Sequence, residues 1–318
     1  MKMRLFLLLM ISLCAVLHAD LRDHLRPCEN KGSNHQMKNI DFIYVINLDE
    51  RPEKLEKTMQ ELEPYNIHPY RFSAVNGWKL TLEEINELGV KYEPGMRSNL
   101  WGTCYLPEDG GEPHHEIMQV PGRNYFCHCM ARGAIGICLS HLSILQDAYD
   151  SGYETIWVME DDIQVIRSPL VIPELIAELD RLVGKKGWDI LFTDPDTKNQ
   201  KGAYVECHGH AHRPNFTPKH PGRFAKRSQC GPYFRKVGAR YGAYSMIVRR
   251  SAMKKILDFI NQYQIFLPLD MDFYLPDDIR LYTTSCDIVS TRPVAESDNG
   301  KPGYILDKKD ALLVDDKG

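Results

Sequence analysis

The fold class follows from one segment, residues 39–48, which reads NIDFIYVINL. Its apolar side chains are nearly continuous and several are β-branched, a composition typical of a strand that is covered on both faces of a parallel sheet. The next four residues, DERP at 49–52, open a helix, because proline is favoured in the first helical turn. We therefore predict a buried strand followed by a helix, which is the beginning of an α/β fold.

The same alternation continues along the chain. Strands are predicted over residues 70–75, 155–159, 188–192 and 241–248, and helices over residues 133–149, 173–183 and 251–260. A weak helix at 81–88 opens a stretch rich in Gly, Pro, His and Cys that extends to residue 132 and has the character of an insertion. Repeated strand and helix order predicts a mostly parallel sheet flanked by helices.

The composition is that of a globular protein. The chain has 318 residues, of which 43% are hydrophobic and 26% charged, which excludes wholesale disorder, collagen and coiled coil. Its 39 basic and 43 acidic residues give a net charge of -4, so the molecule as a whole has no electrostatic footprint for nucleic acid. We expect no nucleic-acid partner, and functional charge must be sought locally.

The first nineteen residues differ from the rest. Lys2 and Arg4 precede an apolar run at residues 5–17 that leads to Ala19, the pattern of a secretory signal. Crossing a bilayer takes about 20 apolar residues, so we expect cleavage rather than a stable membrane span. The protein would then be exported or lumenal: in the ER or Golgi of a eukaryote, or the periplasm or medium of a bacterium. It would be cytoplasmic if the signal at 1–19 is not cleaved, and residues 20–38 should form a flexible N-terminal segment.

Eight cysteines remain after the signal, an even number that permits complete pairing in an oxidising compartment. They are Cys28, Cys104, Cys127, Cys129, Cys138, Cys207, Cys230 and Cys286. We expect most of them to be oxidised, in a connectivity that the sequence leaves open. The Cys-His-Cys segment at 127–129 lacks the second cysteine pair that a zinc site needs, so disulfides or buried thiols are favoured there. The HGHAH segment at 208–212 is interpreted as solvated rather than as a metal site.

The strand at 155–159 ends in three acids, Glu160, Asp161 and Asp162. In open α/β sheets, ligands gather beyond the carboxyl ends of the strands. Carboxylates at positions i and i+2 after a strand can close on one Mg²⁺ or Mn²⁺ ion that also holds a diphosphate. The alternative is a solvated acidic turn. Because a buried strand precedes the triplet, we weigh the metal site and the solvated turn equally.

The segment at residues 213–240 contains eight basic residues and no acid. Such a segment either steers a diphosphate or an anionic acceptor, or is a plain solvated loop. The sequence leaves both interpretations open.

Four ordered blocks carry a resemblance to a known family. They are YVINL at 44–48, GAIGICLSHL at 133–142, the strand that ends in Glu-Asp-Asp at 160–162, and GAYSMIV at 242–248. Together they resemble glycosyltransferase family 25, which includes lipooligosaccharide galactosyltransferases and procollagen galactosyltransferases. The similarity covers roughly residues 40–290. It implies a GT-A type, Rossmann-like fold, a nucleotide-sugar donor that is usually UDP-galactose, and Mn²⁺ or Mg²⁺ as cofactor.

The resemblance also implies roles for individual residues near the donor. Glu160 and Asp162 would lie nearest the metal and the diphosphate, and Asp161 would orient the donor sugar or the ribose. Asn47 would lie by the nucleotide, with a turn-forming role as the equal alternative, and Arg51 would reach a phosphate.

Within the helix block, His141 shares a face with Ile137 and Leu145, because the three are four residues apart. We therefore interpret His141 as a hydrogen-bonded core histidine rather than a base. Gly133 and Gly136 are expected to permit close approach of the helix to its neighbours.

A second acidic cluster contains Asp270 and Asp272, in the region where the family places acceptor-side acids. Many GT-A enzymes supply a late histidine to the metal, but the last histidine here is His220, so a later ligand would be one of these carboxylates. Alternatively, Asp270 or Asp272 is the general base of an inverting transfer, or the pair is a surface turn without a role.

The expected protein is a metal-dependent hexosyltransferase that moves a hexose, with galactose as the first expectation, from a UDP-sugar to a hydroxyl of a glycan or glycoprotein acceptor. A single glycosyltransferase domain would comprise residues 39–305, divided into a nucleotide-sugar half (39–200) and an acceptor half (201–305), followed by a polar tail (306–318). A non-catalytic secreted carbohydrate- or metal-binding relative is the alternative. A metal-dependent phosphate-ester hydrolase would use the same acids but leaves the other three blocks unexplained.

Overall fold

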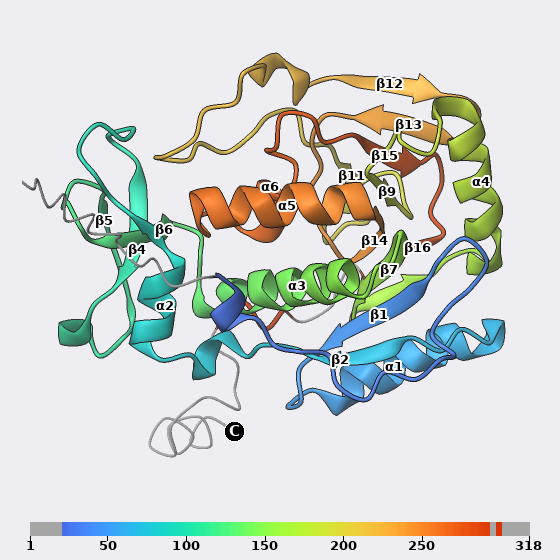
Figure 1. The fold of residues 1–318 in the computed structure, drawn as a ribbon, viewed down its shortest axis with the longest axis horizontal. Coiled ribbons are helices and arrows are strands. Elements are labelled where there is room, and N and C mark those ends of the chain that lie inside the picture. The colour runs from blue at the N-terminus through green and yellow to red at the C-terminus, as the bar shows by residue number, and fades with distance from the viewer. Residues whose placement is uncertain (1–20, 293–296, 301–318) are drawn as a thin grey trace, which may run out of the picture.

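The computed structural model describes residues 21–292 and 297–300 and has an eight-stranded central sheet of order β12-β13-β15-β9-β14-β7-β1-β2 (Figure 1). The predicted signal at 1–19 and the predicted tail at 306–318 lie outside the described residues. The strands of the sheet are β1 (Phe42–Asn47), β2 (Tyr70–Ser73), β7 (Thr155–Glu160), β9 (Ile190–Phe192), β12 (Arg227–Cys230), β13 (Phe234–Val237), β14 (Ser245–Arg249) and β15 (Leu281–Thr284).

The α/β class predicted from the sequence is confirmed. β1 pairs in parallel with both β2 and β7, and β9 pairs in parallel with β15. β14 and β13 are antiparallel to each of their neighbours, so the other six strands share one direction and the sheet is mixed but mostly parallel. The architecture is consistent with a Rossmann-like glycosyltransferase fold.

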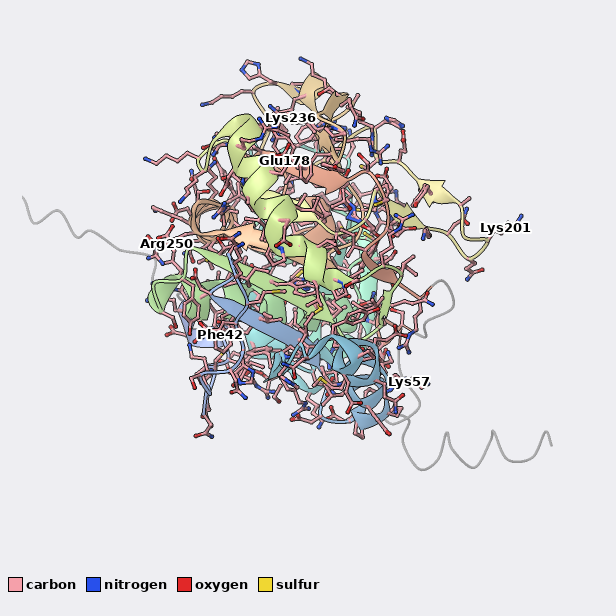
Figure 2. The ribbon with its side chains drawn as sticks, turned by 90° about the vertical axis from the view of Figure 1, so that its right-hand side faces the viewer. Phe42, Lys57, Glu178, Lys201, Lys236 and Arg250 are labelled. Carbon is pink, nitrogen blue, oxygen red and sulfur yellow. The ribbon has the colours of Figure 1, made fainter. Side chains whose placement is uncertain are left out.

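Helices cover both faces of this sheet. They are α1 (Pro52–Leu62), α2 (Leu82–Leu88), α3 (Arg132–Asp150), α4 (Ile172–Val183), α5 (Arg250–Tyr263) and α6 (Leu269–Asp272). α3 and α5 lie side by side in front of the sheet in Figure 1, and Figure 2 shows α4, marked by Glu178, across another part of it. α1 begins at Pro52, as the first-turn preference of proline predicts.

The first strand shows why both faces need cover. All six residues of β1 are buried, and successive side chains point to opposite faces. Phe42, Tyr44 and Ile46 belong to the core beneath α3 and α5, whereas Ile43 and Val45 belong to the core that α4 closes. The continuous apolar run at 39–48 is therefore the signature of a doubly covered strand.

The predicted insertion at residues 81–132 folds into α2 and a separate four-stranded sheet of order β3-β6-β4-β5, on the left in Figure 1. Its strands are β3 (Val90–Lys91), β4 (Trp101–Tyr105), β5 (Pro113–Ile117) and β6 (Asn124–Cys127). Two short ladders complete the strands: β8 (Ile163–Val165) with β16 (Val289–Thr291), and β10 (Thr197–Lys198) with β11 (Tyr204–Val205). This smaller sheet was not predicted from the sequence.

Residues 21–38, expected to be flexible, make defined contacts with the domain. The backbone N–H of Arg26 donates to Ser143 Oγ at 2.9 Å, and its guanidinium donates to the carbonyl of Ala74 at 2.9 Å. Lys31 pairs with Asp147 at 2.8 Å. These contacts join the segment to α3 and to the residue that follows β2.

The basic segment at 213–240 makes contacts that neither interpretation predicted. Four of its arginines pair with buried aspartates from other parts of the chain: Arg213 with Asp272, Arg227 and Arg235 with Asp196, and Arg240 with Asp194. These arginines therefore hold the fold together instead of standing free in a loop.

The eight cysteines from Cys28 onward are free thiols in the structure, so the expected oxidation is not supported by it. No helix within residues 21–292 and 297–300 is long and apolar enough to cross a membrane.

Candidate functional site

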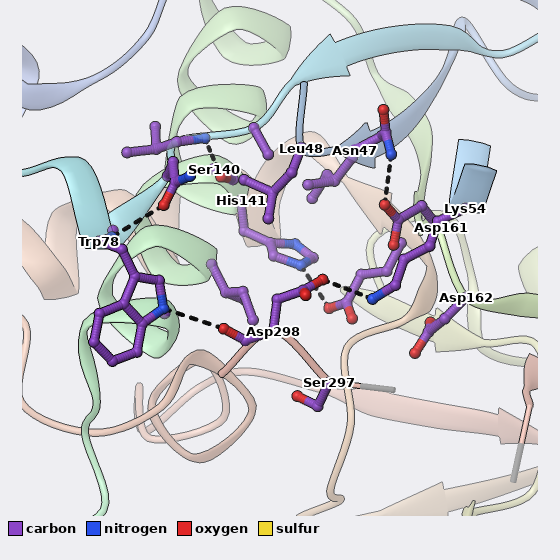
Figure 3. A pocket seen from close by; sticks show the side chains of 18 residues that line it. Asn47, Leu48, Lys54, Trp78, Ser140, His141, Asp161, Asp162, Ser297 and Asp298 are labelled. Carbon is purple, nitrogen blue, oxygen red and sulfur yellow. Dashed lines mark hydrogen bonds and ion pairs between the residues drawn. The ribbon is translucent and has the colours of Figure 1, made fainter. Parts of the chain in front are cut away.

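A pocket opens at the carboxyl ends of β1, β2 and β7, where the sequence analysis expects ligands to gather (Figure 3). The space among its lining residues is about 660 Å³, which includes the part that is open to solvent. Its wall is built by residues 46–48, residues 74–78 after β2, one side of α3, the acidic triplet at 160–162, and residues 297–298. Segments far apart in sequence thus meet at one edge of the sheet.

Backbone contacts hold the acidic triplet in place. The N–H of Glu160 donates to the carbonyl of Tyr244 at 2.9 Å. Thr58 Oγ1 on α1 donates to the carbonyl of Asp161 at 2.8 Å, and the N–H of Arg292 donates to the carbonyl of Asp162 at 3.1 Å. Three different parts of the chain therefore fix the turn, which leaves the carboxylates to the pocket.

Asn47 and Asp161 form a direct pair. Asn47 is 1% exposed at the end of β1, and its Nδ2 donates to Asp161 Oδ2 at 2.7 Å and to the carbonyl of Arg51 at 2.8 Å. Its Oδ1 accepts a hydrogen bond from Arg71 Nε at 3.0 Å. Asn47 thus holds the turn that begins α1 and also orients Asp161, so the two roles considered for it are compatible.

His141 is a buried, hydrogen-bonded histidine, as its helical spacing predicted. It is 1% exposed, and its Nε2 lies 3.0 Å from Glu160 Oε1. The imidazole also lines the pocket (Figure 3), so this core histidine positions the first acid of the triplet.

Two acids of the triplet bind protons more tightly than ordinary aspartates. Burial raises the pKa of Asp161 to about 6, against a lowering by the hydrogen bond from Asn47. Burial, with the charges of Glu160 and Asp161, raises the pKa of Asp162 to about 7. Carboxyl groups are therefore crowded at this edge of the sheet, and a ligand that brings positive charge would favour their ionised forms.

The structure adds pocket residues that the sequence analysis missed. Lys54, in the first turn of α1, pairs with Asp298 at 2.7 Å, and Arg51 also pairs with Asp298. The half-buried Trp78 donates from Nε1 to the carbonyl of Asp298 at 3.3 Å. Lys54 and Trp78 follow β1 and β2 closely, so the rule about carboxyl ends of strands was a signal that pointed to them. No local pattern marks Asp298.

Glycines let α3 approach the pocket wall, as predicted for Gly133 and Gly136. A Cβ atom at Gly136 would collide with the carbonyl oxygen of Val75, and one at Gly133 would collide with the backbone of Asp298 and Asn299. Any larger residue would push α3 away from the segments that line the pocket.

The two acceptor-side acids lie in different surroundings. Asp272 is 1% exposed, and both of its carboxylate oxygens accept from Arg213 Nη1 in a buried ion pair. Asp270 accepts a hydrogen bond from the N–H of Gly242 at 2.9 Å, and burial, with the nearby charge of Glu160, raises its pKa. The carboxylate of Asp272 is thus already paired with a cation, whereas that of Asp270 accepts from a backbone N–H.

The donor set fits a divalent cation in one respect. Asp162 Oδ1 is buried and has no hydrogen-bond partner among the described residues, so this carboxylate oxygen is available to a ligand. The raised pKa of Asp162 indicates that a cation bound there would be favourable. Within that part of the chain, no group of three or more His, Cys, Asp or Glu side chains is arranged to hold a metal. Glu160 and Asp162 would need oxygens from a substrate to complete a coordination shell.

Comparison with known proteins covers the same region. The model of the family described as "Glycosyltransferase family 25 (LPS biosynthesis protein)" matches residues 40–274, well over half of the chain. A "Glycosyltransferase 25 family member" of Aedes aegypti is 27% identical over 173 residues, 54% of this chain and 24% of that protein. "Procollagen galactosyltransferase 1-B" of Xenopus laevis is 25% identical over 155 residues, 48% of this chain and 21% of that protein.

A third relative has a different description. "Inactive glycosyltransferase 25 family member 3" of Homo sapiens is 27% identical over 153 residues, 48% of this chain and 21% of that protein. The matched region thus spans about a quarter or less of these relatives. Among solved structures, A197 from STIV aligns over 76% of this chain and 80% of its own with a TM-score of 0.36 and 10% identity, a likeness too low to carry an argument.

Proposed function

We propose that this chain, which belongs to glycosyltransferase family 25, transfers a hexose from a UDP-sugar to a hydroxyl of a glycan or glycoprotein acceptor. Galactose is the proposed hexose, since a procollagen galactosyltransferase is among the similar proteins. The observation that carries the proposal is the meeting of Asn47, Lys54 and the acidic triplet in one pocket at the carboxyl edge of the sheet.

The pocket offers matching chemistry for each part of a nucleotide sugar. Trp78 presents an aromatic ring on the pocket wall, on which a base can stack. The N-terminus of α1 and Lys54 supply positive potential for phosphates. In the structure, the Asp298 carboxylate forms ion pairs with both Arg51 and Lys54. A diphosphate would therefore compete with the Asp298 carboxylate for the same partners.

The acidic triplet would act on the donor side. Glu160, positioned by His141, and Asp162, with its unpartnered Oδ1, would hold Mn²⁺ or Mg²⁺ together with the diphosphate. When bound, the cation supplies charge that stabilises the departing diphosphate. Asp161, held by Asn47, would accept a hydrogen bond from a donor hydroxyl.

Asp270 is the proposed acceptor-side base if the transfer inverts the anomeric carbon. Its raised pKa lets the carboxylate take the proton of the acceptor hydroxyl as that oxygen attacks. Asp272 would support it by anchoring the short helix α6 to Arg213.

A non-catalytic carbohydrate- or metal-binding relative is the second candidate. The similarity to a protein named an inactive family member favours it. The two candidates share the pocket and differ in turnover.

UDP release separates them. The purified chain should release UDP from a panel of UDP-sugars in the presence of an acceptor and Mn²⁺, with UDP-galactose the preferred donor, and chelator should stop the release. Asp162→Asn should remove most of the turnover, because it deletes a proposed cation ligand.

Asp258→Asn is the matched control, since Asp258 is an exposed acid on α5 paired with Lys254 and the same chemical change there should leave turnover intact. Binding of UDP without release from any donor would favour the non-catalytic candidate. Metal-dependent release that survives Asp162→Asn in a folded protein would reject the assignment of this acid.

A further inference from the structure

A pair of thiols lies outside the pocket, between the smaller sheet and α3. Cys127 ends β6 and is 5% exposed, whereas Cys129 is exposed in the turn that follows. Their Sγ atoms are 2.8 Å apart, whereas bonded sulfurs in a disulfide are about 2.05 Å apart. The two thiols are thus already in contact, one open to solvent and one behind it.

The surrounding backbone holds this contact. The N–H of Cys127 donates to the carbonyl of Phe266 at 2.8 Å, and the N–H of Met130 donates back to the carbonyl of Cys127 at 3.0 Å. Tyr105 Oη donates to the carbonyl of Met130 at 3.0 Å. The turn is therefore fixed from two sides, so bond formation requires a sulfur displacement rather than a rearrangement of distant segments.

Cys129 also differs chemically from several other thiols of the chain, including Cys127, whose pKa is raised by its hydrogen bond with Cys129 and by burial. The hydrogen bond from Cys127 lowers the pKa of Cys129 to about 7, while burial raises the pKa of Cys28 to about 12 and that of Cys104 to about 11. The thiolate is the nucleophile in disulfide exchange, so Cys129 is the accessible attacking sulfur and Cys127 the second one.

We propose that Cys127 and Cys129 form a thiol–disulfide exchange site that reacts reversibly with low-molecular-weight disulfides such as glutathione disulfide. The Cys129 thiolate attacks one sulfur of glutathione disulfide, which forms a mixed disulfide and expels one glutathione thiolate. Cys127 loses its proton to solvent and attacks Cys129 Sγ, which closes the Cys127–Cys129 bond and expels the second glutathione. Two thiols are oxidised, and one disulfide is reduced to two molecules of glutathione.

Metal binding is the competing use of such a pair. Within residues 21–292 and 297–300, the two cysteines find no third His, Cys, Asp or Glu arranged with them around a common ion. Exchange needs no further ligand, so the geometry fits it better.

The chain is well suited to a direct test. Arg123 and Arg132 flank both cysteines, so trypsin releases a peptide, residues 124–132, that contains these two cysteines alone. The folded full-length protein is equilibrated in glutathione buffers of rising disulfide content, quenched in acid, alkylated under denaturing conditions and digested.

The expected result is that this peptide is recovered without either alkyl group, two hydrogens lighter than the unalkylated dithiol peptide. Both alkyl groups should return when reduced glutathione is restored before the quench. The peptide that contains the buried Cys138 should remain alkylated throughout, which serves as the internal control.

Two substitutions test the order of attack. Cys127→Ser should stop the reaction at a glutathione adduct on Cys129, and Cys129→Ser should leave the buried Cys127 alkylatable. A wild-type peptide that keeps both thiols in glutathione disulfide would overturn the proposal, as would one that accumulates two glutathione adducts without closing. The wild-type experiment decides even if a variant fails to fold.

Discussion

The acidic triplet at 160–162 and the basic segment at 213–240 each concentrate one sign of charge, yet the fold treats them in opposite ways. The triplet keeps its charges together, with raised pKa values and an oxygen of Asp162 that has no partner among the described residues. The basic segment distributes its arginines to buried aspartates, such as Asp194 and Asp272.

The two regions also lie in different halves of the sheet. β12 and β13, which belong to the basic segment, form one edge, whereas the triplet follows β7, the strand next to β1 in the other half. Figure 2 shows Lys236 and Lys57, on β13 and α1, at opposite ends of the molecule. Charged side chains that are paired within the fold contribute to the packed structure, whereas crowded carboxylates with raised pKa values indicate a ligand-binding site.

The contrast is sharpest between Asp270 and Asp272, two residues apart. We expect Asp270→Asn to lower transfer by about 10²- to 10⁴-fold, the range of general-base catalysis, while UDP-sugar and Mn²⁺ affinities stay near wild type. Initial rates and calorimetric titrations measure the two quantities. A parallel loss of Mn²⁺ affinity would instead make Asp270 a metal ligand, and normal transfer would exclude it from the mechanism.

Asp272→Ala should act on the fold. Removing one member of a buried ion pair leaves the other charge uncompensated, which costs about 3–5 kcal/mol of unfolding free energy. Chemical denaturation measures this loss, and the double variant Asp272→Leu with Arg213→Met should recover part of it because no lone charge remains buried. A stable single variant that is impaired in transfer alone would return Asp272 to the list of catalytic acids.

The crowding in the triplet predicts a pH dependence. The pKa of Asp162 is raised from its ordinary 3.8 to about 7, so the folded state holds this proton more tightly than the unfolded state. Stability from this group is therefore present below about pH 4 and is lost as the pH rises towards 7. Asp162→Asn should be more stable than wild type by on the order of 4 kcal/mol at pH 8 in chelator, with a smaller difference at pH 5.

Thermal unfolding at the two pH values checks this expectation. Asp258→Asn, at an exposed position, is the control, and its stability relative to wild type should be the same at both pH values. Equal stability of Asp162→Asn and wild type at both pH values would mean that the carboxylates are not crowded in the free protein.

The smallest effect is expected at the exposed basic edge. Lys236→Gln should change the free energy of unfolding by no more than about 0.5 kcal/mol and leave transfer unchanged, because the donor pocket lies at the other edge of the sheet. A fall in kcat/KM that disappears at high salt would show that this edge steers an anionic substrate after all.

Local pattern determined much of this protein. The apolar run at 39–48 predicts a doubly covered strand, Pro52 predicts the start of α1, and the helical period predicts α3 and the burial of His141. The triplet at 160–162 was expected at a strand end, because strands and helices alternate and ligands gather at carboxyl ends. These features depend on interactions within a few residues, which a sequence displays directly.

Other features required the tertiary structure. Asp298 reaches Arg51 across 247 positions of sequence, and Arg213 meets Asp272 across 59, so neither pair leaves a local mark. The smaller sheet formed by β3 to β6 is built from short strands whose pairing is visible only once the chain has closed. Asp270 and Asp272 differ for the same reason: burial raises the pKa of both, but only Asp272 meets a buried arginine, and that partner is brought to it by folding.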